Sequence, residues 1–159
     1  MHFAVSTALR LRLAFVGAAL VALLAVPQAF AGTEAALGSF VEGPETITSF
    51  QAADGNEIYT LTREAVFSGT YSGVGQVEQR IVIHKDGSFN VNMTIAFTGL
   101  ACGRPAELTF RVSGQGDFTT NDFTGGYSVI GPAATGKGEG TFSATPGVGG
   151  TYSGAAHCG

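Results

Sequence analysis

The sequence predicts an all-β fold, an eight-stranded antiparallel up-and-down β-barrel, and three observations predict it. Apolar residues recur at every second position, clusters of Gly, Asn, Asp and Pro divide the chain into short segments, and the links between segments are short. Neighbouring strands joined by short links pair antiparallel, and closure into a barrel removes the exposed sheet edges. A two-sheet β-sandwich is the alternative architecture.

The first 31 residues have the pattern of a secretory signal peptide. Arg10 and Arg12 precede an unbroken apolar run over residues 13–26, and Ala29–Ala31 forms a small-x-small cleavage site. The apolar run is shorter than the roughly 20 residues of a membrane-spanning helix. We therefore expect cleavage after Ala31, no stable membrane anchor afterwards, and a location that is secreted, extracellular or in the cell envelope.

Beyond the cleavage site we expect a flexible N-terminal lead over residues 32–45 and a single barrel domain over residues 46–159. No stretch of this part shows a convincing helical period. The eight expected strands lie near 46–51, 57–70, 74–84, 88–98, 106–116, 122–130, 136–144 and 149–157.

The strand expected at 88–98 shows the alternation most clearly. One face carries apolar residues and the other carries Ser, Asn and Thr, which is typical of a strand between a core and water. The apolar face comprises Phe89, Val91, Met93, Ile95 and Phe97.

The turn before this strand can be assigned a register. A three-residue loop over residues 85–87, with Gly87 in the left-handed conformation, sets Ile83 opposite Phe89. A two-residue turn would set Ile83 opposite Asn90, and a slip of one residue moves every side chain to the other face. Matching of the apolar residues therefore favours the three-residue loop.

The two cysteines are predicted to form a disulfide. An even count behind a signal peptide favours a bridge, and Cys102 and Cys158 end strands that run in the same direction, so both lie at the same rim. No His or Asp stands near them at the spacing of a zinc site, although His157 adjoins Cys158. We expect no metal and no cofactor.

Composition and motifs exclude several classes of function. Loss of Arg10 and Arg12 leaves six of the eight basic residues against 12 acidic ones, a net charge of −6, so we expect neither nucleic-acid nor anionic-lipid binding. No nucleophile elbow, P-loop or zinc-protease motif is present in the sequence. His84 and His157 are expected at the rims without an orienting carboxylate, so we assign no catalytic residue and lean against an enzyme.

Candidate ligand-binding residues follow from strand parity, because side chains that share a face with the core point into the lumen. Arg63 is the one charged residue on the inward parity, and no inward carboxylate is expected beside it. A buried arginine without a partner is costly, so Arg63 either binds an anionic ligand group or is turned to solvent by a β-bulge, which we favour. The lumen candidates are Arg63, Tyr71, Gln79, Phe89, Met93, Phe97, Phe110, Tyr127 and Tyr152.

The pentapeptide GTYSG occurs twice, at residues 69–73 and 150–154. In a strand, Tyr71 and Tyr152 point inward between glycines, a small–large alternation that lets the wall of a small barrel curve. We interpret the repeat as a structural feature of the barrel wall, with two tyrosine hydroxyls that need partners if buried.

The segments HKDGSFNVNMTIAFTG, GKGEGTFSA and the terminal GTYSG resemble a mostly uncharacterised family of bacterial proteins. This family is similar to the allene oxide cyclase-like β-barrels, the superfamily that also holds the plant dirigent proteins. The resemblance covers the chain from about Thr60 to the end and rests on glycine and turn patterns. It implies an eight-stranded barrel whose central cavity binds an apolar substrate and steers its cyclisation or coupling. No catalytic residue of those relatives can be matched here.

Three functions remain open. The first is a secreted barrel that binds a small hydrophobic ligand in its lumen; the second is a cofactor-independent cyclase or isomerase; the third is a structural or interaction protein of the cell envelope. An open cavity would favour the first two over the third. A lumen carboxylate or a buried Arg63 would favour the enzyme over the plain binder. The sequence does not determine the oligomeric state.

Overall fold

The computed structural model describes residues 32–131 and 136–158, and this part of the chain is all-β. The predicted signal peptide at 1–31 lies outside the described residues. In the described part there is no helix long and apolar enough to cross a membrane. The strands are β1 (Thr33–Glu42), β2 (Thr46–Ala53), β3 (Asn56–Gly69), β4 (Tyr71–Ile83), β5 (Ser88–Ala101), β6 (Arg104–Asp117), β7 (Asp122–Ile130), β8 (Gly138–Thr145) and β9 (Gly149–His157).

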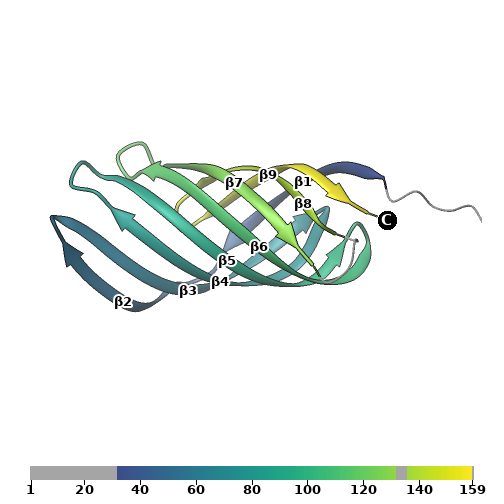
Figure 1. Cartoon of the computed structure of the whole chain (residues 1–159), viewed down its shortest axis with the longest axis horizontal. Coiled ribbons are helices and arrows are strands. Elements are labelled where there is room, and N and C mark those ends of the chain that lie inside the picture. Colours follow the sequence, from purple (N-terminus) through teal and green to yellow (C-terminus); the bar gives the residue numbers. More distant parts are fainter. Residues whose placement is uncertain (1–31, 132–135, 159) are drawn as a thin grey trace, which may run out of the picture.

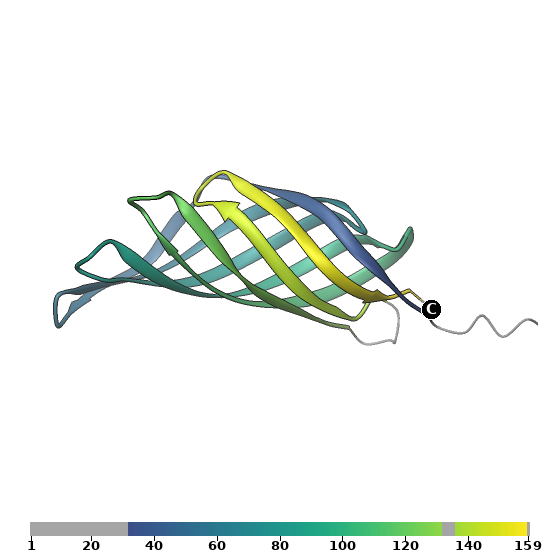
Figure 2. The same cartoon turned by 90° about the horizontal axis from the view of Figure 1, so that it is seen from above.

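Eight of these strands close into the predicted antiparallel up-and-down barrel, and β2 is an additional ninth strand (Figures 1 and 2). The sheet runs in the order β1-β9-β8-β7-β6-β5-β4-β3-β2, and β1 pairs with the C-terminal half of β3 to complete the ring. The N-terminal half of β3 pairs with β2 instead. Figure 1 shows the β2–β3 hairpin projecting at the end opposite the C-terminus.

The expectation of a flexible lead over residues 32–45 is wrong for most of that segment. Residues 33–42 form β1, a wall strand that pairs with both β9 and β3, whereas the strand expected at 46–51 is the extra strand. Outward Leu37 and Val41 are apolar like inward Ala36 and Phe40. Apolar residues on both faces hide the two-residue period, and for this reason the strand does not stand out in the sequence.

The predicted register of the β4–β5 hairpin is confirmed. Ile83 lies opposite Phe89, and the pairing continues without a shift along both strands. Gly87 has a φ of 88°, the left-handed conformation that the loop requires. The carboxylate of Asp86 accepts hydrogen bonds from the amide and hydroxyl of Ser88, at 3.0 and 2.6 Å, and fixes the turn.

One half of the lumen is filled mainly by aromatic side chains. The ring of Phe110 lies 5.5 Å from that of Phe67, 5.6 Å from Phe97 and 5.0 Å from Tyr71, between ring centroids. Such stacked and edge-on pairs bury large apolar areas and add a favourable quadrupole term. This half of the barrel is therefore a core, and we refer to its end as the closed end.

The disulfide and the repeated pentapeptide meet at the closed end. Cys102 and Cys158 form the predicted disulfide, with Cα atoms 5.7 Å apart. Tyr71 and Tyr152 both point inward, and the hydroxyl of Tyr152 accepts a hydrogen bond from the backbone amide of Tyr71 at 3.0 Å. The two copies of GTYSG thus contact each other over Gly38 of β1, and both tyrosine hydroxyls have partners.

A β-bulge in β2 shapes the opposite end. The pairing of β2 with β3 shifts between Ile47 and Ser49, and the hydroxyl of the intervening Thr48 donates to the carbonyl of Thr60 at 3.1 Å. The bulge changes which residues share a face, so Ile47 and Phe50 both lie opposite inward residues of β3. We refer to this end, where the long hairpins project, as the mouth.

Candidate functional site

The mouth contains a cavity of about 410 Å³, which we call the mouth cavity. This volume lies within the range of about 300–1,000 Å³ that is typical of small-molecule sites. Its walls are apolar, and four polar side chains converge at its floor. The apolar walls comprise Ile47, Tyr59, Leu61, Ile81, Ile83, Phe89, Val91, Phe118 and Phe123, and the polar residues are Glu42, Glu45, Arg63 and Gln79.

The floor of the cavity is a buried ion-pair cluster. Arg63 Nη1 lies 2.6 Å from Glu42 Oε2, and Nη2 lies 3.0 Å from Glu45 Oε2. The side chains of Arg63 and Glu42 are 5% and 8% exposed, whereas that of Glu45 is 51% exposed. Glu42 Oε2 also accepts a hydrogen bond from the amide of Gly147 at 2.9 Å. The cluster links β1, β3, the segment between β1 and β2, and the β8–β9 turn.

The favoured expectation that a bulge turns Arg63 to solvent is wrong. The pairing of β3 with β4 is regular through Arg63, which lies opposite Val77, so its side chain stays on the inward face. The expectation of no inward carboxylate is wrong for the same region, because Glu42 at the end of β1 supplies one. A carboxylate in hydrogen-bonding contact is what makes a buried arginine tolerable.

Glu42 is the titratable group of this cluster with the most altered environment. Burial raises the pKa of Glu42 above its usual value, and the neighbouring Arg63 and the Gly147 amide offset part of that effect. A carboxyl group whose pKa is raised by burial in a cavity is a candidate for proton transfer to or from a bound molecule.

Two buried polar atoms of the floor have no hydrogen-bond partner among the described residues. They are Arg63 Nε, a donor, and Gln79 Oε1, an acceptor. The two residues are diagonal neighbours on the inward face, since Arg63 lies opposite Val77 and Gln79 lies two residues further along β4. Buried polar groups are almost always satisfied, so an unpaired donor and acceptor in one cavity indicate a missing polar partner.

A second, smaller cavity of about 40 Å³ lies between the mouth cavity and the closed end. We call it the inner cavity. Glu42 lines both cavities, and Tyr127 lines the inner one. The hydroxyl of Tyr127 is buried with no partner among the described residues, and burial raises its pKa to about 12. The lumen is thus open at the mouth, narrow in the middle and packed at the closed end.

The structure divides the predicted lumen residues into three groups. Arg63, Gln79 and Phe89 line the mouth cavity, and Met93, Phe110, Tyr127 and Tyr152 line the inner cavity. Tyr71 and Phe97 belong to the packed core of the closed end. All nine point inward, as strand parity predicts, but they do not form one site.

Several residues of the mouth cavity are absent from the sequence prediction, chiefly Glu42, Glu45 and Phe118. Both glutamates fall in the segment expected to be a flexible lead, and Phe118 belongs to the turn between β6 and β7. A signal for Glu42 exists in the sequence, because it shares parity with Ala36 and Phe40. A lone inward arginine also calls for a carboxylate.

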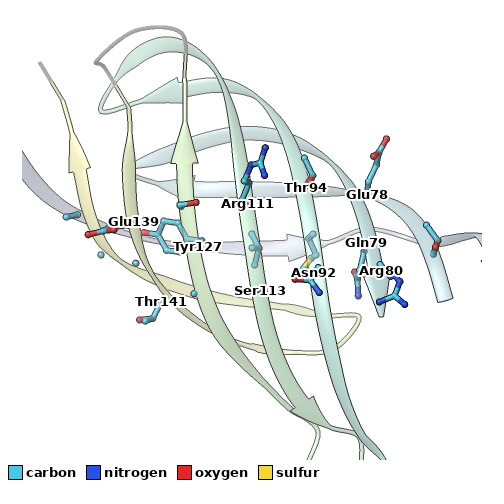
Figure 3. A pocket seen from close by; sticks show the side chains of 18 residues that line it. Glu78, Gln79, Arg80, Asn92, Thr94, Arg111, Ser113, Tyr127, Glu139 and Thr141 are labelled. Carbon is cyan, nitrogen blue, oxygen red and sulfur yellow. The ribbon is translucent and has the colours of Figure 1, made fainter. Parts of the chain in front are cut away.

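A further pocket of about 1,020 Å³ crosses the sheet, and its lining combines outward residues with the inward Gln79, Met93, Val112 and Tyr127. Two cross-strand rows of polar side chains line it: Glu78, Thr94 and Arg111 in one, Arg80, Asn92 and Ser113 in the other (Figure 3). These side chains are exposed. Exposed charges of both signs on a sheet face are ordinarily solvated, so the mouth cavity, with its buried and unpaired groups, is the stronger candidate site.

In the part of the chain that the structure describes, neither the histidines nor any cluster of potential metal ligands forms a second candidate site. His84 contacts Asn56 and Asn90, at 3.2 and 2.8 Å, and His157 contacts Thr33 at 3.3 Å. Neither histidine has a carboxylate partner in these contacts. Residues 32–131 and 136–158 contain no group of three or more side chains placed to hold a metal ion.

The fold is similar to that of a protein of unknown function from the DUF3224 family of Shewanella oneidensis MR-1. The crystal structure of that protein superposes with a TM-score of 0.59 at 16% sequence identity, over 79% of this chain and 98% of the other. At this identity the similarity shows a shared β-barrel fold. No family model matches the chain, and no curated protein sequence matches it significantly.

Proposed function

We propose that this protein binds a small, mainly apolar ligand in the mouth cavity. The observation that carries the proposal is a cavity of about 410 Å³ with apolar walls and an unpaired buried donor and acceptor, Arg63 Nε and Gln79 Oε1, at its floor. Ligand sites typically combine apolar walls with a few polar groups that fix orientation. A purely structural barrel gains nothing from leaving these groups buried and unsatisfied.

We further propose that the protein acts outside the cytoplasm, in the cell envelope or the extracellular space. The disulfide between Cys102 and Cys158 is consistent with an oxidising compartment. The signal peptide predicted for residues 1–31 supports the same location.

The test is binding of a neutral apolar fluorophore, N-phenylnaphthylamine, measured by its emission on titration with the protein. Ile83 is a wall residue of the mouth cavity, and Ile83→Trp should fill part of that space and weaken binding by tenfold or more. Val82→Trp is the matched control, because Val82 is the adjacent residue of β4 and lies on the opposite face. It should leave the affinity within about twofold of the wild type.

Two outcomes would contradict the proposal. One is the absence of saturable binding to the wild type. The other is an equal effect of the two tryptophan variants, which would place the fluorophore on the outer surface. Circular dichroism of both variants checks that the barrel remains folded.

A second candidate function is a cofactor-independent cyclase or isomerase, the activity type implied by the resemblance to allene oxide cyclase-like barrels. Glu42 and the buried Arg63 favour it over plain binding, because a buried carboxyl group with a raised pKa borders both cavities and is hydrogen-bonded to a buried arginine. It stands second because no catalytic residue of those relatives can be matched in this chain. In this role Glu42 would transfer a proton to or from a bound apolar substrate.

The test of this second function is stereochemical. An allene oxide cyclises without a catalyst to a racemic product, and an enzyme would make one enantiomer predominate, as chiral chromatography reports. Glu42→Gln keeps the size of the side chain but cannot transfer a proton, and it should restore the racemic product. A racemic product with the wild type would rule out this activity on allene oxides.

A further inference from the structure

The charge of the cluster beneath the mouth cavity restricts the kind of ligand that can bind there. Arg63 is held by two carboxylates, those of Glu42 and Glu45. With both glutamates ionised the cluster has a net charge of −1, and with Glu42 protonated it is neutral. In neither state is there a net positive charge to attract an anion.

The buried side-chain atoms of this floor that have no partner among the described residues are one donor and one acceptor. One N–H of each terminal guanidinium nitrogen of Arg63 donates to a glutamate, and Nε–H is buried without a partner among the described residues. Gln79 contributes the free acceptor, Oε1. A carboxylate could accept from Arg63 Nε–H, but it has no proton for Gln79 Oε1 and its charge would be repelled by Glu42 and Glu45.

A hydroxyl group has the complementary chemistry. Its oxygen accepts a hydrogen bond and its proton is donated, so it can pair with both a donor and an acceptor while carrying no charge. We infer that the ligand of the mouth cavity is an apolar molecule with a neutral hydroxyl head group, and that this site discriminates against the corresponding carboxylate. This inference rests on the proposed binding function and specifies its ligand class.

Discrimination of this kind is expected to be strong. A buried polar atom left without a partner is destabilising, and a buried anion beside two carboxylates adds electrostatic repulsion. Sites built to hydrogen-bond a hydroxyl reject analogues that lack it more effectively than apolar pockets reject an extra methylene.

The experiment compares three ligands of equal chain length as displacers of N-phenylnaphthylamine: decanol, its methyl ether and decanoate. At about pH 8 decanoate is fully ionised. Decanol should displace the fluorophore at a concentration at least tenfold lower than decanoate. The ether keeps the oxygen acceptor but lacks the hydroxyl proton, so it measures what the donation to Gln79 contributes.

Because decanol is also more hydrophobic than decanoate, the decisive comparison uses Gln79→Leu, which keeps the size of the side chain and removes its acceptor. Loss of one hydrogen bond should weaken decanol binding by about tenfold. Binding of the ether should change by less than twofold, since the ether cannot donate to Gln79. Retained affinity for the ether also shows that the variant is folded.

The results separate this inference from the function on which it rests. If decanoate binds as tightly as decanol, or if Gln79→Leu weakens the two neutral ligands equally or not at all, the cavity binds apolar molecules but the head-group inference is wrong. If neither the fluorophore nor any of the three ligands binds the wild type, the proposed function itself is wrong.

Discussion

At the scale of single residues, the inward tyrosines differ in how their hydroxyls are satisfied. Tyr152 Oη accepts from the Tyr71 amide at 3.0 Å and donates to the Ser68 carbonyl at 3.1 Å. Tyr127 Oη is also buried but has no partner in the described structure. Both rings fit because the opposite residue is glycine, Gly38 for Tyr152 and Gly140 for Tyr127. A Cβ at either glycine would meet the hydroxyl.

This difference predicts that replacing each tyrosine with phenylalanine affects the stability of the protein differently. Tyr152→Phe leaves the buried Tyr71 amide unpaired and should lower the free energy of unfolding by about 1–3 kcal/mol. Tyr127→Phe removes a hydroxyl that has no partner and should be neutral or stabilising. Urea unfolding followed by circular dichroism measures both, and equal losses in the two variants would contradict this description of the lumen.

Sequence reasoning predicts which residues point inward, because the two-residue period is local. It assigns all nine lumen candidates to the correct face. It does not find the partner of Arg63, because an ion pair between residues 21 positions apart depends on how β1 and β3 meet. The division of the lumen into a cavity and a packed core also depends on side chains from many strands. A pattern within one strand therefore does not predict it.

At the scale of elements, the ion-pair cluster lies where the partner of β3 changes. β1 pairs with one half of β3 and β2 with the other half, and the cluster lies between them. The chain leaves the barrel wall after Glu42, and the amide of Gly43 donates to the Glu64 carbonyl at 2.8 Å. Arg63 of β3 therefore contacts the end of one strand through Glu42 and, through Glu45, the segment just before the next. The cluster fixes the point at which the extra strand departs.

Glu42 makes the stability of this junction depend on pH. Burial raises the pKa of Glu42 in the folded protein, so between its unfolded and folded values the folded state binds more protons. The contribution of this group to stability is therefore highest below the unfolded pKa and falls as pH rises through the folded pKa. The charged groups that contact Glu42 are Arg63 and, through Arg63, Glu45.

Glu42→Gln cannot ionise and should lack this fall. Relative to the wild type, the variant should gain in free energy of unfolding as pH rises from about 4 to 8, a range that starts near the usual glutamate pKa. Urea denaturation at several pH values measures the difference. Glu107→Gln, at an exposed carboxylate of β6, controls for a general change in charge. A difference that moves in the other direction would mean that Arg63 outweighs burial.

Elements differ in how clearly the sequence predicts them. The β4–β5 hairpin is predicted in register because its turn residues and its apolar matching agree. β1 is not predicted, because outward Leu37 and Val41 remove the contrast between its faces. The bulge of β2 likewise leaves no clear pattern, since Ile47 and Phe50 are three residues apart yet lie on one side of the strand.

At the scale of the whole molecule, the barrel is asymmetric along its axis. One end holds the disulfide and the aromatic core, and the other holds the mouth cavity. The hairpin of β2 and β3 projects at the mouth (Figure 1). Composition and strand count predict a closed barrel, but they do not predict which end is packed and which is open, because this depends on how side chains from many strands pack together.

The disulfide is expected to contribute measurably to the free energy of unfolding. It joins residues 56 positions apart, and for a loop of that length the chain-entropy model gives about 4 kcal/mol. Cys102→Ala/Cys158→Ala should lower the free energy of unfolding by about 2–5 kcal/mol. Reductant should destabilise the wild type by a similar amount and leave the double variant unchanged. A smaller effect would show that the closed end is held by its core.

The pairing of β1 with β9 has a kinetic consequence. Thr33 lies opposite His157, so the first wall strand of the barrel meets the last one. The ring cannot close until nearly the whole chain is available, and Cys158 reaches Cys102 at the same late stage. Contacts of such long sequence separation slow folding, because the two ends of a long chain segment must meet before the β1–β9 pairing compensates for the entropy that is lost. Until then β1 and β9 each present an unpaired edge, so this barrel is most exposed to misassociation just before it is complete.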